Sequence, residues 1–114
     1  MVDRTYDGSF GWPKLTLEDA HALHTFFHDC GFKTWQTLCS ETVKGLAKHH
    51  AQSIGTLEKE AQDRLKALKL DDLDELFRFR LTGTRRLWGF RGDGDEFFVL
   101  WWDPNHKVYI VEKT

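Results

Sequence analysis

Five arginines and no acidic residue lie between positions 78 and 91, in the stretch RFRLTGTRRLWGFR. The arginines alternate with aromatic and aliphatic residues, so a folded strand would hold the cations in a row. Guanidinium groups bind phosphate oxygens through paired hydrogen bonds, and aromatic rings stack on bases. The row therefore suits a phosphodiester backbone or an acidic protein partner. The alternative is a solvated sheet face that pairs with the acidic residues of the same chain, including DDLDE at 71–75.

His106 is a second candidate for chemistry, because it follows a Pro-Asn turn beside the predicted sheet. Loops at the end of a sheet commonly carry functional side chains, and an imidazole can serve as a base or an acid near neutral pH. Three other histidines, His21, His24 and His28, recur at helical spacing and could hold zinc. However, no carboxylate is spaced as in a known metal motif and HEXXH is absent, so the sequence favours a polar helix face with no metal or other cofactor.

The first part of the chain has helical periodicity. An irregular arm over residues 1–15 precedes a helical half over 16–75, which is predicted to hold helices at 16–30, roughly 34–50 and 56–70. Thr16 and Asp19 form a capping-box pattern at the first helix. The predicted buried residues are Leu17, Ala20, Leu23, Phe27 and Cys30 in the first helix, and Leu57, Ala61, Leu65 and Leu68 in the third.

The period changes to two after Leu76, which predicts an antiparallel meander of three or four strands over residues 76–114. The expected strands cover 76–82, 85–91, 96–102 and 107–113. EFFVLWW is apolar on both faces, so it is predicted in the middle of the sheet. The fold class is therefore α+β, with about three helices followed by the sheet.

The register of the first hairpin decides which arginines share a face with Arg78 and Arg80. A two-residue loop at 83–84 would add Arg85 and Arg91, whereas a three-residue loop would add Arg86, Trp88 and Phe90. Because a slip of one residue exchanges the two faces, the sequence leaves both registers open.

Composition narrows the class of protein. The chain has 114 residues, of which 40% are hydrophobic and 14% aromatic, which predicts one globular domain over residues 1–114. No apolar run approaches the roughly 20 residues that span a bilayer, and no secretion signal begins the chain, so we expect a cytoplasmic location without membrane association. The net charge of −2 excludes binding of nucleic acid by bulk charge.

The order LFRFRLTGTRRLWGF, an acidic turn, FFVLWW and then NHKVY resembles the C-terminal sheet of the RelE/ParE superfamily of bacterial toxins. The resemblance covers residues 57–111, and the ending is also similar to small bacterial proteins that carry a WWDPxH segment. It implies the toxin of a toxin–antitoxin pair, with an antitoxin as partner. The RelE branch cleaves messenger RNA in the ribosomal decoding site, and the ParE branch acts on DNA gyrase.

The resemblance also implies roles for individual residues in a metal-independent endoribonuclease. Such an enzyme needs a base, an acid and a cation to stabilise the phosphorane as the RNA 2′-hydroxyl attacks. The implied catalytic residues are Arg86, His106 and Tyr109, and the implied RNA-binding residues are Arg78, Arg80, Arg85, Trp88 and Lys107. The alternative is a non-catalytic module with the same fold that inhibits gyrase or docks an acidic protein partner, which the negative net charge favours.

Overall fold

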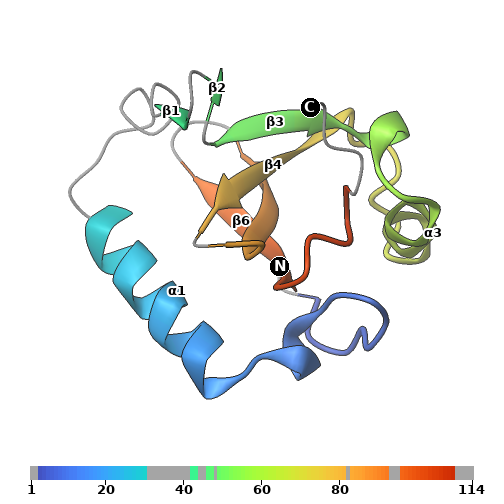
Figure 1. Cartoon of the computed structure of the whole chain (residues 1–114). Helices are drawn as coiled ribbons and strands as arrows, with labels where there is room; N and C mark the ends of the chain where they lie inside the picture. Colours follow the sequence, from blue (N-terminus) through green and yellow to red (C-terminus); the bar gives the residue numbers. More distant parts are fainter. Residues whose placement is uncertain are drawn as a thin grey trace.

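The core of the protein is a four-stranded antiparallel sheet with the strand order β3-β4-β5-β6 (Figure 1). A computed structural model describes residues 3–30, 42–43, 46–47, 49–81, 83–92 and 96–109. The described helices are α1 (Leu17–Cys30) and α3 (Lys59–Ala67), with 3₁₀ turns at Trp12–Lys14 and Ile54–Thr56. The described strands are β1 (Thr42–Val43), β2 (Leu46–Ala47), β3 (His50–Ser53), β4 (Glu75–Arg80), β5 (Arg86–Arg91) and β6 (Phe97–Asp103). The predicted α+β class is confirmed.

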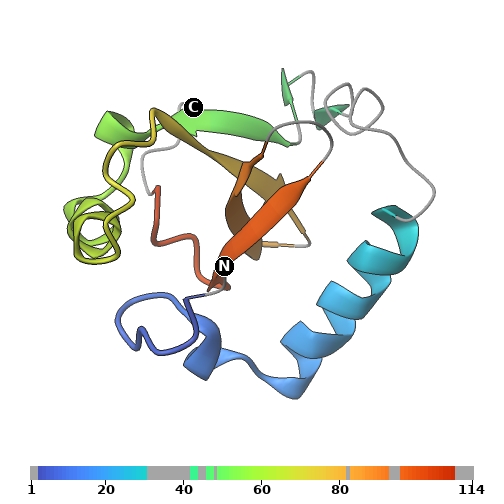
Figure 2. The same cartoon turned by 180° about the vertical axis from the view of Figure 1, so that it is seen from behind.

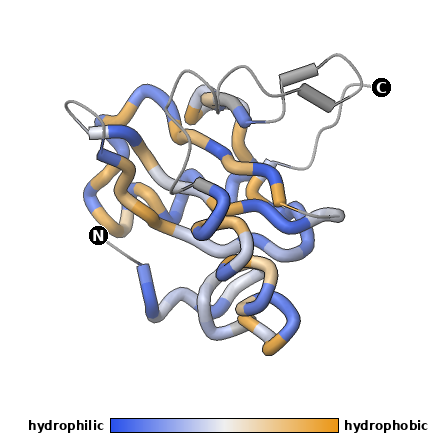
Figure 3. Tube along the Cα trace, turned by 90° about the vertical axis from the view of Figure 1, so that its left-hand side faces the viewer, coloured by the Kyte–Doolittle hydropathy of each residue, from blue (hydrophilic) through white to orange (hydrophobic). Residues whose placement is uncertain are grey.

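Each face of the sheet packs against a different helix, because the side chains of the strands alternate between the two faces. Figures 1 and 2 show α1 on one side of the sheet and α3 on the other, and Figure 3 shows hydrophobic and hydrophilic residues in short alternating stretches along the tube. The phenylalanine face contacts α1 and consists of Phe77, Phe79, Leu81, Leu87 and Trp102. The arginine face lies on the α3 side and consists of Leu76, Arg78, Arg80, Arg86, Trp88, Trp101 and Asp103.

The third predicted helix is confirmed as α3, and its packing follows the predicted stripe. Leu57, Ala61 and Leu65 are buried against the sheet, and Leu68 is half-buried beside them. The C-terminal segment 104–109 lies between the sheet and α3 (Figure 1). Val108 of this segment is fully buried in the same cluster, and its carbonyl accepts a hydrogen bond from the Glu58 amide at 2.9 Å.

The predicted place of EFFVLWW in the middle of the sheet is wrong, because β6 is the last strand in the order. The N-terminal arm covers its outer edge: the Asp3 amide donates to Leu100 and the Gly11 amide donates to Trp102, at 3.1 and 2.7 Å. With both faces and the outer edge covered, an edge strand can be as apolar as a central one. A bulge between Trp88 and Gly89 also places Leu100 and Trp101 in the same cluster.

The second predicted helix, at 34–50, is not found at the positions that the structure describes. Thr42–Val43 and Leu46–Ala47 pair with each other as short strands, and His50 begins β3. The β-branched residues Thr42 and Val43 favour a strand, and pairing with β4 outweighs the helical periodicity around β3. The remainder of the predicted helix lies outside the described residues.

The last predicted strand, at 107–113, also differs from the structure. Residues 107–109 form no strand, and the rest of the stretch lies outside the described residues. The fourth strand of the sheet is instead β3, which precedes α3 in the chain. The helical half expected at 16–75 therefore contributes one of the four strands.

Candidate functional site

Three of the arginines share one face of the sheet. Arg80 pairs with Arg86, and Arg78 pairs with Trp88, so all four side chains lie on the arginine face. The Leu81 amide donates to the Arg85 carbonyl at 2.9 Å, which leaves a three-residue loop between them. In the three-residue-loop register Arg86 would pair with Thr82, whereas in the structure it pairs with Arg80. Because this shift is two residues, Arg86 and Trp88 still face the same side as Arg78 and Arg80, as that register predicts.

The arginine face is not open at most of these positions. Arg78 and Arg86 are 5% and 4% exposed, Trp88 is completely buried, and Arg80 is half-buried. α3, the C-terminal segment and Phe10 of the N-terminal arm pack in the cluster that buries Trp88, and the arm also follows the β6 edge. In this conformation the side chains of Arg78, Arg86 and Trp88 do not reach a nucleic acid.

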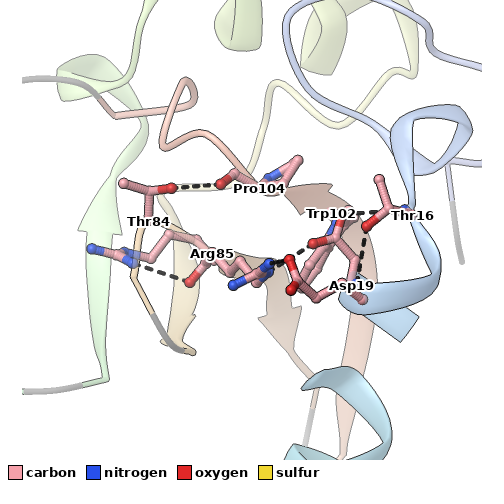
Figure 4. A network of polar contacts seen from close by, with 8 residues as sticks. Thr16, Asp19, Thr84, Arg85, Trp102 and Pro104 are labelled. Carbon is pink, nitrogen blue, oxygen red and sulfur yellow. Dashed lines mark hydrogen bonds and ion pairs between the residues drawn. The ribbon is translucent and has the colours of Figure 1, made fainter. Parts of the chain in front are cut away.

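Arg85 points away from the arginine face and binds carboxylates of α1 (Figure 4). Its Nε donates to Asp19 at 2.7 Å, and an Nη donates to Glu18 at 2.7 Å. The Trp102 indole N–H donates to the same Asp19 carboxylate at 3.1 Å. Burial alone would raise the pKa of Asp19, but the hydrogen bonds from Arg85, Trp102 and Thr16 outweigh it and lower that pKa.

Asp19 also closes the predicted capping box at the start of α1. Its amide donates to the Thr16 hydroxyl at 3.1 Å, and the Thr16 amide donates to the Asp19 carboxylate at 3.2 Å. The predicted box is therefore confirmed. The same carboxylate caps the helix and holds it against Arg85 and Trp102.

Asp103 forms a second carboxylate centre at the end of β6. It is fully buried, and its two oxygens accept the Lys107 and Val108 amides at 2.8 and 2.9 Å. Arg86 lies opposite Asp103 across β5 and β6. Burial raises the pKa of Asp103, and the two amides, the Trp88 side chain and the charge of Arg86 offset that effect only in part.

The hairpin loop and the DPNH turn meet at this corner of the sheet. Arg86 Nη1 donates to the carbonyls of Gly83 and Arg85 at 2.9 and 3.0 Å. The Thr84 hydroxyl donates to the Pro104 carbonyl at 2.7 Å (Figure 4). Arg86 therefore serves to fasten the loop in this structure.

Asp3 forms a third carboxylate centre, between the N-terminal arm and α3. Arg64 donates two hydrogen bonds to it, from Nε at 2.8 Å and from Nη2 at 2.6 Å, and the Trp101 indole donates a third at 2.8 Å. Burial opposes ionisation of Asp3, but these bonds prevail and lower its pKa. Arg64 also lies over the Tyr6 ring, 5.0 Å from its centroid.

Each of these buried carboxylates has one tryptophan and one arginine beside it. We call the three groups the Asp–Trp–Arg units; they are Asp3–Trp101–Arg64, Asp19–Trp102–Arg85 and Asp103–Trp88–Arg86. A buried carboxylate is stabilised only when hydrogen bonds and opposite charge replace the lost water. Hydrogen bonds from tryptophan and arginine offset the burial of Asp3 and Asp19, whereas Asp103 accepts mainly the Lys107 and Val108 amides.

The remaining predicted site residues lie after the DPNH turn. His106 is half-buried and has a left-handed backbone with φ of 59°, Lys107 is exposed, and Tyr109 is half-buried against the arginine-face cluster. Arg80 and Lys107 make no ion pair with any described residue. The predicted residues that solvent reaches are Arg80, Arg85, His106, Lys107 and Tyr109, and their roles stay predictions.

Sequence reasoning did not find Asp3, Arg64 or Asp103, and it saw Asp19 only as a cap. A usable signal was the pair Trp101-Trp102, since two adjacent tryptophans on opposite faces each need a buried hydrogen-bond acceptor, and Asp3 and Asp19 are those acceptors. The described residues contain no group of three potential metal ligands, and His21, His24 and His28 are exposed on α1. None of the described helices is long and apolar enough to cross a membrane.

No protein-family model matches the chain, and no match was found among curated proteins or among solved structures.

Proposed function

We propose that this chain is a RelE/ParE-like module that acts by binding a protein partner and not by cutting RNA. The main support is the environment of Arg86, the residue expected against the scissile phosphate. Its side chain is 4% exposed, and Nη1 donates to the Gly83 and Arg85 carbonyls. A cation that stabilises a phosphorane has to reach the phosphate oxygens, and this one is directed into the fold.

Arg85 supports the same proposal. Asp19 and Glu18 occupy its guanidinium, so the cation is neutralised within the chain. The net charge of −2 also suits a protein partner better than bulk contact with nucleic acid. In this proposal the protein acts in the cytoplasm, an antitoxin-like protein is one partner, and a second protein such as gyrase is the target.

The experiment is controlled expression in a bacterium, followed by primer extension on translated messages. A binding module produces no new message ends, whether or not growth stops. It also forms a stable complex when it is expressed together with the product of the adjacent reading frame. New message ends that disappear in the Tyr109→Phe variant would contradict the proposal.

The second candidate is ribosome-dependent cleavage of messenger RNA, which the groups at one end of the arginine face favour. Arg80 and Lys107 reach solvent there, and Tyr109 is half-buried on the same side of the sheet. These groups could contact a phosphate, with the phenol as a proton carrier and His106 as a base or acid. Loss of cleavage in Arg80→Ala and Lys107→Ala, with unchanged thermal stability, would establish this candidate.

A further inference from the structure

The outward side of α1 carries large apolar side chains that the sequence pattern assigns to the core. Leu17 and Phe27 were predicted to be buried, but they are 89% and 49% exposed. Leu23 is buried as predicted, and the inward side is completed by Asp19 and Phe26. The buried side of α1 is therefore not centred on the apolar residues that the sequence pattern predicted to be buried.

The Asp19 unit fixes which side of α1 is buried. Asp19 lies two residues after Leu17, so it points to the opposite side of the helix, about 200° away. Its carboxylate binds Arg85 and Trp102 at 2.7 and 3.1 Å in the interior. Turning Leu17 inward would withdraw Asp19 from both groups, so the exposure of Leu17 is built into the fold.

Three imidazoles lie along the same outward side. At about 100° per residue, Leu17, His21, His24 and His28 fall within roughly 60° of one another, and Phe27 borders them. We call these five residues the α1 outer stripe, and all of them are exposed. Leu17 and Phe27 lie near the two ends of this stripe, so it presents apolar and imidazole groups together along one side of α1.

The stripe itself contains no carboxylate. Glu18 lies to one side and is bound by Arg85, and Asp29 lies 3.8 Å from the His28 Nδ1. Imidazole N–H groups donate hydrogen bonds to carboxylates, with added attraction when the ring is charged. A complementary surface therefore combines apolar side chains with Asp or Glu.

We propose that the α1 outer stripe docks an acidic amphipathic helix of a protein partner. This inference rests on the proposed function, because it names the surface through which the module binds. A second copy of the chain fits poorly, since paired α1 helices would set imidazoles against imidazoles. The 14 residues of α1 match about four turns of a partner helix.

The test uses the whole chain and a fluorescent synthetic helical peptide with Leu at every third or fourth position and Glu beside each Leu. A matched peptide carries Gln in place of every Glu. We expect the Glu peptide to bind, and the Gln peptide to bind roughly tenfold more weakly, in fluorescence anisotropy. Leu17→Ser and Phe27→Ser should each weaken binding of the Glu peptide by about tenfold.

Ala67→Ser on α3 is the matched control, because Ala67 is exposed and lies outside the stripe. Thermal unfolding of all variants checks that the fold is intact. Equal binding of the Glu and Gln peptides, or binding unaffected by Leu17→Ser and Phe27→Ser, would overturn the proposal. A dimer of the chain that dissociates on Leu17→Ser would overturn it too, by assigning the stripe to a second copy. Message cleavage in cells would defeat the proposed function but would leave these binding results standing.

Discussion

Trp101 and Trp102 are neighbours in β6, and their indole N–H groups donate to two different buried aspartates on opposite sides of the sheet. Trp101 binds Asp3 at 2.8 Å, and Trp102 binds Asp19 at 3.1 Å. Because adjacent strand residues face opposite ways, the pair joins the N-terminal arm to one face and α1 to the other. One short sequence thereby fastens two remote segments to a single strand.

Removing the Asp19 carboxylate should destabilise the fold strongly. Asp19→Ala leaves the buried Trp102 indole without an acceptor and Arg85 with Glu18 alone, so we expect a loss of about 1–3 kcal/mol in the free energy of unfolding. Asp63→Ala is the control, since Asp63 forms an exposed pair with Lys59 at 3.4 Å and should cost less than about 1 kcal/mol. Urea denaturation measures both, and equal effects would show that the Asp19 unit does not stabilise the fold.

Asp3 and Asp19 should make the protein sensitive to acid. The pKa of each is lowered from 3.8 in the folded protein, so the unfolded chain binds more protons just below that pH. The free energy of unfolding therefore falls as the pH falls through the folded pKa values. In Asp19→Asn this decline should be shallower, as measured by urea denaturation between about pH 2 and 5. An unchanged slope would mean that Asp19 is not ionised against Arg85.

Asp103 should lower the stability of the protein as the pH rises, which is opposite to the effect of Asp3 and Asp19. Its pKa is raised from 3.8 in the folded protein, so the folded state binds more protons above that pH. Its contribution to stability is therefore fully present below pH 3.8 and is lost as the pH rises through the folded pKa. Asp103→Asn should remove this loss, so its stability relative to the wild type rises with pH. Asp71→Asn, at an exposed position, serves as the control in the same titration.

Gly89 should not tolerate a side chain, because β5 and β6 approach closely at the bulge. A Cβ at Gly89 would lie 2.2 Å from the Phe98 carbonyl oxygen and 2.5 Å from the Phe97 ring. We expect Gly89→Ala to cost about 1–3 kcal/mol, because backbone on one side limits relief. Gly55→Ala is the control, since nothing lies within 4 Å of its added Cβ. Thermal unfolding compares them, and equal melting temperatures would contradict the close approach.

The period-two pattern after Leu76 was enough to predict β4, β5 and β6, because Phe77 and Phe79 alternate with arginines. The α3 stripe and the capping box were also predictable, since both depend on residues close together in the chain. The second helix was predicted wrongly because β3 is held by pairing with β4, a contact remote in sequence. Such pairing outweighs local propensity.

The candidate site was harder to predict for a related reason. Alternation correctly gave a shared face to Arg78 and Arg80, but it does not reveal whether that face is covered. Trp88 on that face is covered by Phe10, Val108 and α3. Asp103 holds Val108 in place by accepting two amides of the segment that follows it. Likewise, the rotation of α1 follows from the Asp19–Arg85 contact, which joins residues 66 positions apart.

The interior position of the arginine face is tested most directly by arginine modification of the native protein. Phenylglyoxal treatment followed by peptide mass spectrometry reports the reaction rate of each arginine separately. We expect Arg91, which is exposed, to react quickly, and Arg78 and Arg86 to react only after denaturation. If Arg86 reacts in the native protein as fast as Arg91, the arginine face is open, and the account of a buried, non-catalytic row is wrong.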